Sequence, residues 1–214
     1  MPEYGKPAYW EERYQKDSSS NFDWYCTLVN CADILRPYLS SGSKILHVGC
    51  GNSRMATQLY DDGYKNVTNI DISETVVHQM QQKYADQPEL TFQVMDTRRM
   101  TFDDESFDVV VDKATLDALL CGRESFDNAY LMNKEVQRVL KPGGVFICIS
   151  YGTPDSRLDH FSRHGLNWTT ETKTIPKALA TDDPSNPSSY FYVYVMRKRQ
   201  SNVDDAEPEP KDES

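Results

Sequence analysis

Short apolar segments alternate with amphipathic segments from Lys44 onward, and this alternation constrains the fold more than any other feature. Apolar runs bounded by turn residues predict strands, whereas apolar residues spaced three and four apart predict helices. We expect strands at 45–48, 67–70, 90–95, 107–111 and 145–150. Helices are expected at 53–62 and at 126–140, and another helix is expected to begin after Ser73, which can cap it. Strands that alternate with helices predict an α/β protein, with a mainly parallel sheet and helices on both faces.

The N-terminal part of the chain lacks this alternation. Residues 9–14 predict a short helix, because Trp10, Arg13 and Tyr14 then share one face. A second helix is expected at 26–39, and Pro37 with the Ser and Gly residues after it ends that helix.

The C-terminal part ends differently again. The Lys-Pro-Gly-Gly segment at 141–144 predicts a turn into the fifth strand. Two further strands are expected at 166–174 and 190–196, without a long helix between them. Because a short connection suits antiparallel neighbours, the sheet is expected to end antiparallel.

The net charge of −10 is unevenly distributed along the 214 residues. Residues 201–214 carry six acidic groups and one lysine, which is half of that charge. Neither part has the clustered Lys and Arg that contacts with nucleic-acid phosphates require, so we expect no direct nucleic-acid partner. The mildly acidic body suits a basic protein partner or a small substrate, or it only keeps the protein soluble. The residues from 200 to 214 predict a disordered acidic tail.

Cysteine usage and the N-terminus indicate the compartment. The five cysteines are odd in number and include no CxxC pair, which is typical of reduced thiols in an intracellular protein. The first ten residues contain no apolar core of a secretory signal, and no apolar run approaches the length of a membrane span. We expect a cytoplasmic, monomeric protein without membrane attachment.

A glycine-containing loop follows the first expected strand. Gly49 and Gly51 let the backbone approach a ligand, and the next helix directs free N–H groups toward the same place. Glycine also occurs in such turns for purely structural reasons. The third glycine of the dinucleotide pattern is missing, because Met55 and Ala56 follow instead, and this counts against NAD.

Aspartates follow the next two expected strands. Asp71, 20 residues after Gly51, is placed to accept both hydroxyls of an adenosine ribose, although a helix-capping role is the alternative. Asp96 and Thr97 end the third strand and suit the adenine amino group, although a turn role is the alternative. The carboxyl ends of parallel strands meet at one edge of the sheet, so these groups together predict a nucleoside site there.

The segment after the fourth strand is the last candidate. Asp112 and Lys113, with Thr115 and Asp117, would lie at the reactive end of such a site. Lys113 directly follows an apolar strand, which favours a pocket position as much as an ordinary surface charge.

Other catalytic patterns are missing from the sequence. His160 and His164 have the spacing of some metal ligands, but no Cys or HExxH context accompanies them, so we expect no metal. No GxSxG elbow or Walker loop occurs, and no catalytic residue is assigned.

Five segments together resemble class I S-adenosylmethionine (SAM)-dependent methyltransferases: ILHVGCGNS, NIDIS, VMDTRRM, FDVVVDKATLDALL and VLKPGGVF. The resemblance covers roughly residues 8–197. The combination of YWEERY, FDWY, GCGNS and DKATLDAL is more specific, and it resembles the methyltransferase-like group that modifies lysines of translation elongation factor 1-alpha. That group often has Glu-Lys-Gly where this chain has Asp112-Lys113-Ala114.

This resemblance implies a Rossmann-like seven-stranded sheet with the last strand antiparallel. It divides the chain into an N-terminal helical segment over the cofactor site (1–43), a methyltransferase domain (44–199) and the tail (200–214). It implies SAM contacts at Trp10, Tyr14 and Trp24, with Gly49 at the methionine part, Asp71 and Ile72 at the ribose, Asp96 and Thr97 at the adenine, and Lys113 nearby.

The implied function is protein-lysine N-methylation with SAM as cofactor and elongation factor 1-alpha as partner. SAM carries an activated methyl group, so the protein mainly aligns the reactants and excludes water. An aromatic-walled channel favours the neutral amine, and such walls are available in Trp10, Tyr14, Trp24 and Tyr151. A small-molecule methyltransferase and a non-catalytic SAM-binding module are the alternatives.

Overall fold

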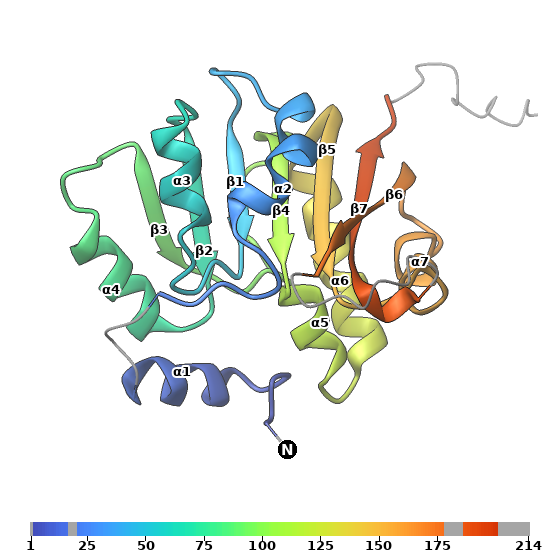
Figure 1. Ribbon diagram of the computed structural model, residues 1–214, viewed down its shortest axis with the longest axis horizontal. Helices are drawn as coiled ribbons and strands as arrows, with labels where there is room; N and C mark the ends of the chain where they lie inside the picture. Colours follow the sequence, from blue (N-terminus) through green and yellow to red (C-terminus); the bar gives the residue numbers. More distant parts are fainter. Residues whose placement is uncertain (1, 17–20, 178–185, 201–214) are drawn as a thin grey trace, which may run out of the picture.

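A computed structural model describes residues 2–16, 21–177 and 186–200, and its centre is one seven-stranded sheet (Figure 1). The strands are β1 (Ile45–Val48), β2 (Val67–Asp71), β3 (Leu90–Val94), β4 (Phe107–Lys113), β5 (Leu140–Ser150), β6 (Trp168–Pro176) and β7 (Tyr190–Lys198). Their order across the sheet is β3-β2-β1-β4-β5-β7-β6. The pairs from β3 to β5 are parallel, and β7 is antiparallel to both β5 and β6. The predicted fold class is therefore confirmed.

Helices cover both faces of the sheet (Figure 1). They are α1 (Pro7–Lys16), α2 (Leu28–Leu35), α3 (Met55–Asp61), α4 (Glu74–Lys83), α5 (Thr115–Leu120), α6 (Ser125–Val139) and α7 (Pro154–Phe161), with 3₁₀ turns η1 (Arg36–Tyr38) and η2 (Pro187–Ser189). Side chains alternate across a strand, so Val109 and Val111 of β4 enter the core under α2, α3 and α4. Val110 enters the opposite core under α5, α6 and α7.

Two short helices were not predicted from the sequence. The α5 helix begins directly after β4, where Asp112 accepts the backbone N–H groups of Thr115 and Leu116. The α7 helix has Thr153 at its N-cap and Pro154 in its first turn. Proline at this position is a helix-start signal, so the sequence does carry a cue for α7.

The turn predicted at 141–144 is wrong, because β5 already begins at Leu140. Leu140 pairs with Phe107 and Val145 pairs with Val109, so the four residues between them form an irregularity opposite the single residue Asp108. The Lys141 ammonium binds the Asp108 carboxylate at 2.6 Å and holds this bulge against β4. The glycines give the bulge its backbone freedom inside a strand instead of a loop.

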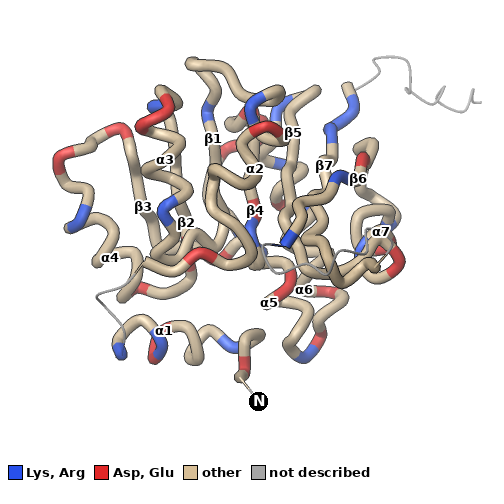
Figure 2. The backbone as a smooth tube through the Cα atoms, viewed as in Figure 1, with Lys and Arg blue, Asp and Glu red and all other residues tan. Residues whose placement is uncertain are grey.

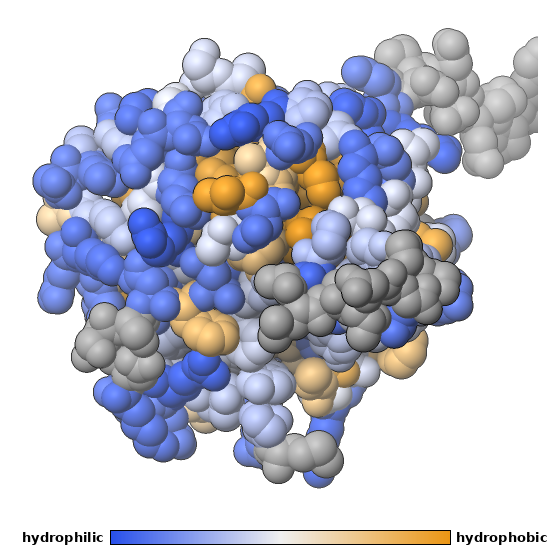
Figure 3. All heavy atoms as spheres, viewed as in Figure 1, coloured by the Kyte–Doolittle hydropathy of each residue, from blue (hydrophilic) through white to orange (hydrophobic). Residues whose placement is uncertain are grey.

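Charges of both signs are mixed along the described backbone, and Figure 2 shows no continuous basic stripe on it in this view. Figure 3 shows apolar side chains gathered around α2, where Val29 is 79% exposed. None of the helices in the described ranges has both the length and the apolar character needed to cross a bilayer. The acidic tail predicted at 200–214 lies outside the described residues except for Gln200.

Candidate functional site

The carboxyl ends of β1 to β4 meet at one edge of the sheet, and α1 lies across that edge (Figure 1). Loops at this edge and the N-terminal segment enclose about 880 Å³ of empty space, part of which is open to solvent. All nine residues assigned from the sequence line this cavity: Trp10, Tyr14, Trp24, Gly49, Asp71, Ile72, Asp96, Thr97 and Lys113. The structure therefore brings them together where open α/β sheets bind ligands.

The loop after β1 is shaped by its two glycines, which both have positive φ angles, +58° at Gly49 and +50° at Gly51. A Cβ on Gly49 would lie 1.9 Å from the Thr115 hydroxyl, and a Cβ on Gly51 would lie 2.5 Å from the Tyr14 hydroxyl. Both positions thus need glycine for conformation and for space. As a result α1 and α5 close directly onto the floor of the cavity.

The Asp71 carboxylate at the end of β2 is buried and fixed. One oxygen accepts the Gly51 N–H at 2.8 Å, and the other accepts the Ser73 N–H at 3.0 Å. Burial raises the pKa of Asp71, and the backbone donors oppose this by stabilising the carboxylate. Each oxygen has a second lone-pair direction beyond these bonds, so the carboxylate has acceptor capacity left for two hydroxyl groups.

At the end of β3, Asp96 has a partner that the sequence reasoning missed. The Arg98 guanidinium binds both Asp96 oxygens, with contacts of 3.0 Å and 2.6 Å, and also donates to Asn128 at 2.7 Å. Burial acts to raise the pKa of Asp96, but the Arg98 bonds outweigh it and hold this pKa below its ordinary value. Arg98 itself lines the cavity. The sequence did carry a signal for this pair, because Arg98 is a basic residue only two positions after the aspartate that ends the strand.

Lys113 is a structural anchor as well as a lining residue. Its ammonium donates to the Asp23 carboxylate at 3.0 Å and to the Trp24 carbonyl at 3.1 Å, and it is almost fully buried. Burial acts to raise the pKa of Asp23, but the Lys113 charge and the Ser53 hydroxyl outweigh it, so the carboxylate stays ionised. This pair ties the segment before α2 to the end of β4.

An N-terminal strap, residues 2–16, lies across the strand ends, at the bottom of Figure 1, and supplies one wall of the cavity. At one end a Cβ on Gly5 would lie 2.3 Å from the Cα of Gly122, which shows how closely the two backbones approach. At the other end the Glu11 carboxylate accepts bonds from the Ser73 hydroxyl at 2.6 Å and from the Thr75 hydroxyl. The strap is thus fastened on both sides of the cavity.

Aromatic rings fill the underside of the strap. The Trp10 ring stacks near Tyr14 at 6.3 Å between centroids and meets Trp24 edge-on at 6.2 Å. The Arg13 guanidinium lies over both the Phe22 and Trp24 rings. Exclusion of water by these rings strengthens the polar contacts beneath them.

Replacing Glu11 with alanine is expected to loosen the strap and weaken binding of a ligand in the cavity. Loss of its hydrogen bonds to α4 should raise the dissociation constant for SAM about three- to tenfold, mainly through faster release. Stopped-flow dissociation and titration calorimetry measure both quantities. Glu12→Ala is the matched control, because Glu12 is exposed on the same helix and, among the described residues, pairs with Lys16. Equal release rates in the two variants would show that the Glu11 latch does not hold the strap.

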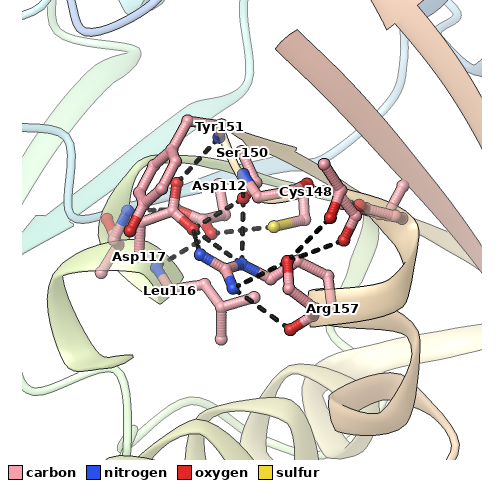
Figure 4. Close-up of polar contacts among 12 residues, drawn as sticks. Asp112, Leu116, Asp117, Cys148, Ser150, Tyr151 and Arg157 are labelled. Carbon is pink, nitrogen blue, oxygen red and sulfur yellow. Dashed lines mark hydrogen bonds and ion pairs between the residues drawn. The ribbon is translucent and has the colours of Figure 1, made fainter. Parts of the chain in front are cut away.

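The segment after β4 divides into lining and supporting residues. Lys113, Ala114 and Thr115 line the cavity. Asp112 instead caps α5, and burial raises its pKa to about 6. Ala114 has a φ of +80°, a conformation that favours glycine, and this is the position where the resembling group carries glycine. Asp117 lies outside the cavity, at the centre of a polar cluster (Figure 4).

His47 of β1 is a lining residue that the sequence reasoning did not single out. It is 1% exposed, and its Nδ1 atom has no hydrogen-bond partner within the described residues. Burial and the nearby Lys113 charge lower the pKa of His47 to about 4, so the ring is neutral at physiological pH. From the sequence, His47 was recognised only as part of the apolar strand β1 and not as a residue of the site.

These groups fit SAM. The Asp71 oxygens suit two ribose hydroxyls, and the buried Thr97 hydroxyl, which has no partner within the described residues, suits a polar atom of the ligand. The aromatic strap suits a flat adenosine and a sulfonium cation. Among the described residues no cluster of three or more His, Cys, Asp or Glu is arranged for a metal.

Comparisons with known proteins agree with this arrangement. Residues 46–148 match the family model described as "Methyltransferase domain". In the solved structures, the chain is similar to a TehB-like SAM-dependent methyltransferase from Corynebacterium glutamicum, with a TM-score of 0.61 and 20% identity, covering 91% of this chain and 100% of that one. This likeness supports the fold.

Two curated relatives are closer in sequence. The "eEF1A lysine and N-terminal methyltransferase" of Xenopus laevis is 35% identical over 92% of this chain, although the chain spans only 29% of that relative's length. The "EEF1A lysine methyltransferase 4" of Mus musculus is 33% identical over 92% of this chain and 76% of its own length. The chain therefore belongs to the SAM-dependent methyltransferases, in the family that includes EEF1A lysine methyltransferase 4.

Proposed function

We propose that this protein transfers a methyl group from SAM to a lysine amine of translation elongation factor 1-alpha, and that it acts as a monomer in the cytoplasm. The observation that carries the proposal is that all nine sequence-assigned residues line the same cavity at the strand ends. The names of the relatives from Xenopus laevis and Mus musculus support the choice of substrate.

Each side of the cavity has its own task in this proposal. Asp71, next to Ile72, accepts the ribose hydroxyls, and Asp96 and Thr97 recognise the adenine, with Arg98 fixing the Asp96 carboxylate. Gly49 leaves room for the methionine part. The rings of Trp10, Tyr14 and Trp24 cover the cofactor, and Lys113 holds the segment that carries Trp24.

SAM, when bound, supplies an electrophilic methyl group that needs no further activation. SAM would supply its methyl carbon to the neutral lysine amine, and the sulfur would keep the electron pair of the broken carbon–sulfur bond, which gives S-adenosylhomocysteine as the second product. The protein's share is to align the amine with the methyl group and to favour the neutral amine by excluding water. The proton leaves the amine to solvent before the attack.

The proposal is tested by incubating the purified protein with methyl-labelled SAM and either purified elongation factor 1-alpha or a cell lysate. We expect a labelled band at the size of the elongation factor, with label on lysine by mass spectrometry. Label confined to small molecules would favour the small-molecule alternative. Absence of SAM binding at high micromolar cofactor would contradict any methyltransferase function. The Asp71→Ala variant serves as the negative control.

A further inference from the structure

A buried polar cluster beside the cavity centres on Asp117 of α5 (Figure 4). One carboxylate oxygen accepts the Ser150 hydroxyl at 2.6 Å and two N–H bonds from the Arg157 guanidinium, at 3.0 Å and 2.9 Å. The other accepts the Tyr151 N–H at 3.1 Å and the Tyr25 hydroxyl at 2.8 Å. Asp117 thus joins the loop after β5, α7 and the N-terminal segment.

Tyr25 is the partner of Asp117 that lies next to the cofactor cavity. Its ring is 6.2 Å from the lining residue Trp24, 6.1 Å from Tyr151 and 5.0 Å from Phe191, measured between centroids. Tyr151 is 51% exposed. These rings contact one another in a row that begins at Trp24 in the cavity wall and includes the exposed Tyr151 ring.

The backbone of Tyr25 is held in an unfavourable conformation. Its φ angle is +64°, a region that costs a non-glycine residue of order 1 kcal/mol or more. Lys113 bonds to the neighbouring Trp24 carbonyl, and Asp117 bonds to the Tyr25 hydroxyl, so both ends of this turn are fixed. Such strain is retained where surrounding contacts dictate the position of a side chain, and it clusters at functional sites.

We propose that Tyr25 positions the substrate lysine: its oxygen accepts an N–H of the incoming amine, and its ring, with those of Tyr151 and Phe191, lines the entry path. Asp117 acts through Tyr25 as a positioning residue. This inference deepens the proposed function and rests on it.

The chemistry of the tyrosine hydroxyl suits this role. Burial and the Asp117 carboxylate raise the pKa of Tyr25 above its usual value, so the group stays a neutral phenol. A hydroxyl that donates to a carboxylate keeps its lone pairs for a second partner and becomes a better acceptor. The aromatic faces favour a cationic side chain on entry.

Tyr25→Phe is the sharpest test, because it removes the hydroxyl and keeps the ring. We expect kcat/KM for purified elongation factor 1-alpha to fall about tenfold, as for the loss of one oriented hydrogen bond, while SAM affinity changes less than about twofold. Tyr38→Phe is the matched control, since the Tyr38 hydroxyl accepts a bond from Lys173 of β6 and donates to Glu171, so its removal breaks bonds that involve none of the three rings that line the entry path. The control should keep the wild-type kcat/KM.

A double-mutant cycle with Asp117→Asn tests whether the two residues act as one unit. The double variant Tyr25→Phe with Asp117→Asn should lose no more kcat/KM than Tyr25→Phe alone, because Asp117 acts through the Tyr25 hydroxyl, which Tyr25→Phe already lacks. Wild-type kcat/KM in a folded Tyr25→Phe protein would overturn the inference. A wild-type protein that does not label the elongation factor would instead defeat the proposed function, so the two failures are distinguishable.

Discussion

Replacing Asp71 with alanine is expected to weaken SAM binding by about 1–3 kcal/mol, which is about a 5- to 150-fold rise in the dissociation constant. The carboxylate is buried at the end of β2 and already oriented by the Gly51 and Ser73 N–H groups. Its removal takes away the acceptors that we propose for the ribose hydroxyls, and it leaves the Gly51 and Ser73 N–H groups without this partner. Titration calorimetry with SAM measures the loss.

The matched control for this prediction is Asp108→Ala. Asp108 also accepts a backbone N–H, from Lys44, and it lies in β4 of the same sheet, but at the opposite end of the strands. SAM affinity should be unchanged in this control. An Asp71→Ala protein that is folded by circular dichroism and binds SAM with wild-type affinity would contradict the ribose assignment.

Replacing Arg157 with leucine is expected to lower the free energy of unfolding by about 3–5 kcal/mol, the cost of breaking a buried ion pair from one side. The Arg157 and Asp117 side chains are 8% and 4% exposed, so the substitution leaves a buried carboxylate without its counter-ion. The substitution also removes the packing of the guanidinium against the Gly152 backbone, which is so close that a Cβ on Gly152 would lie 2.3 Å from the guanidinium carbon. Loss of this contact lowers the free energy of unfolding further. Urea unfolding monitored by circular dichroism measures the change.

Arg36→Leu provides the comparison for Arg157→Leu. Arg36 pairs with Asp62 at 3.2 Å, but both side chains are well exposed. Exposed pairs of this kind contribute less than about 1 kcal/mol. Equal destabilisation by the two substitutions would show that the Asp117 cluster is no more important for stability than a surface pair.

The sheet and its edge were predictable because their signals are local. Each of the parallel strands is a short apolar run, and the residue after it is fixed at the carboxyl edge once the strand is recognised. Asp71 and Asp96 could therefore be assigned to one site although 25 positions separate them. The irregular start of β5 was missed, because a bulge opposite Asp108 and a turn use the same Pro-Gly-Gly residues.

The supporting contacts were not predictable, because they join distant parts of the chain. Lys113 meets Asp23 across 90 positions, and Tyr25 meets Asp117 across 92. The hydrophobic periodicity of the sequence does not predict contacts between residues so far apart along the chain. Lys113 was assigned to the pocket because it follows an apolar strand. Only the folded chain shows that it also anchors the N-terminal segment. Tyr151, expected in the wall of an aromatic channel, does not line the cavity itself, and its ring contacts that of Tyr25.

A crystal structure of the protein with S-adenosylhomocysteine is the most direct measurement of the central claim. We expect the nucleoside to lie across the ends of β1, β2 and β3 beneath the strap, with the ribose hydroxyls on Asp71 and the sulfur directed toward Ala114. A nucleoside bound elsewhere, or a strand-end cavity that stays closed by side chains in the complex, would contradict the account.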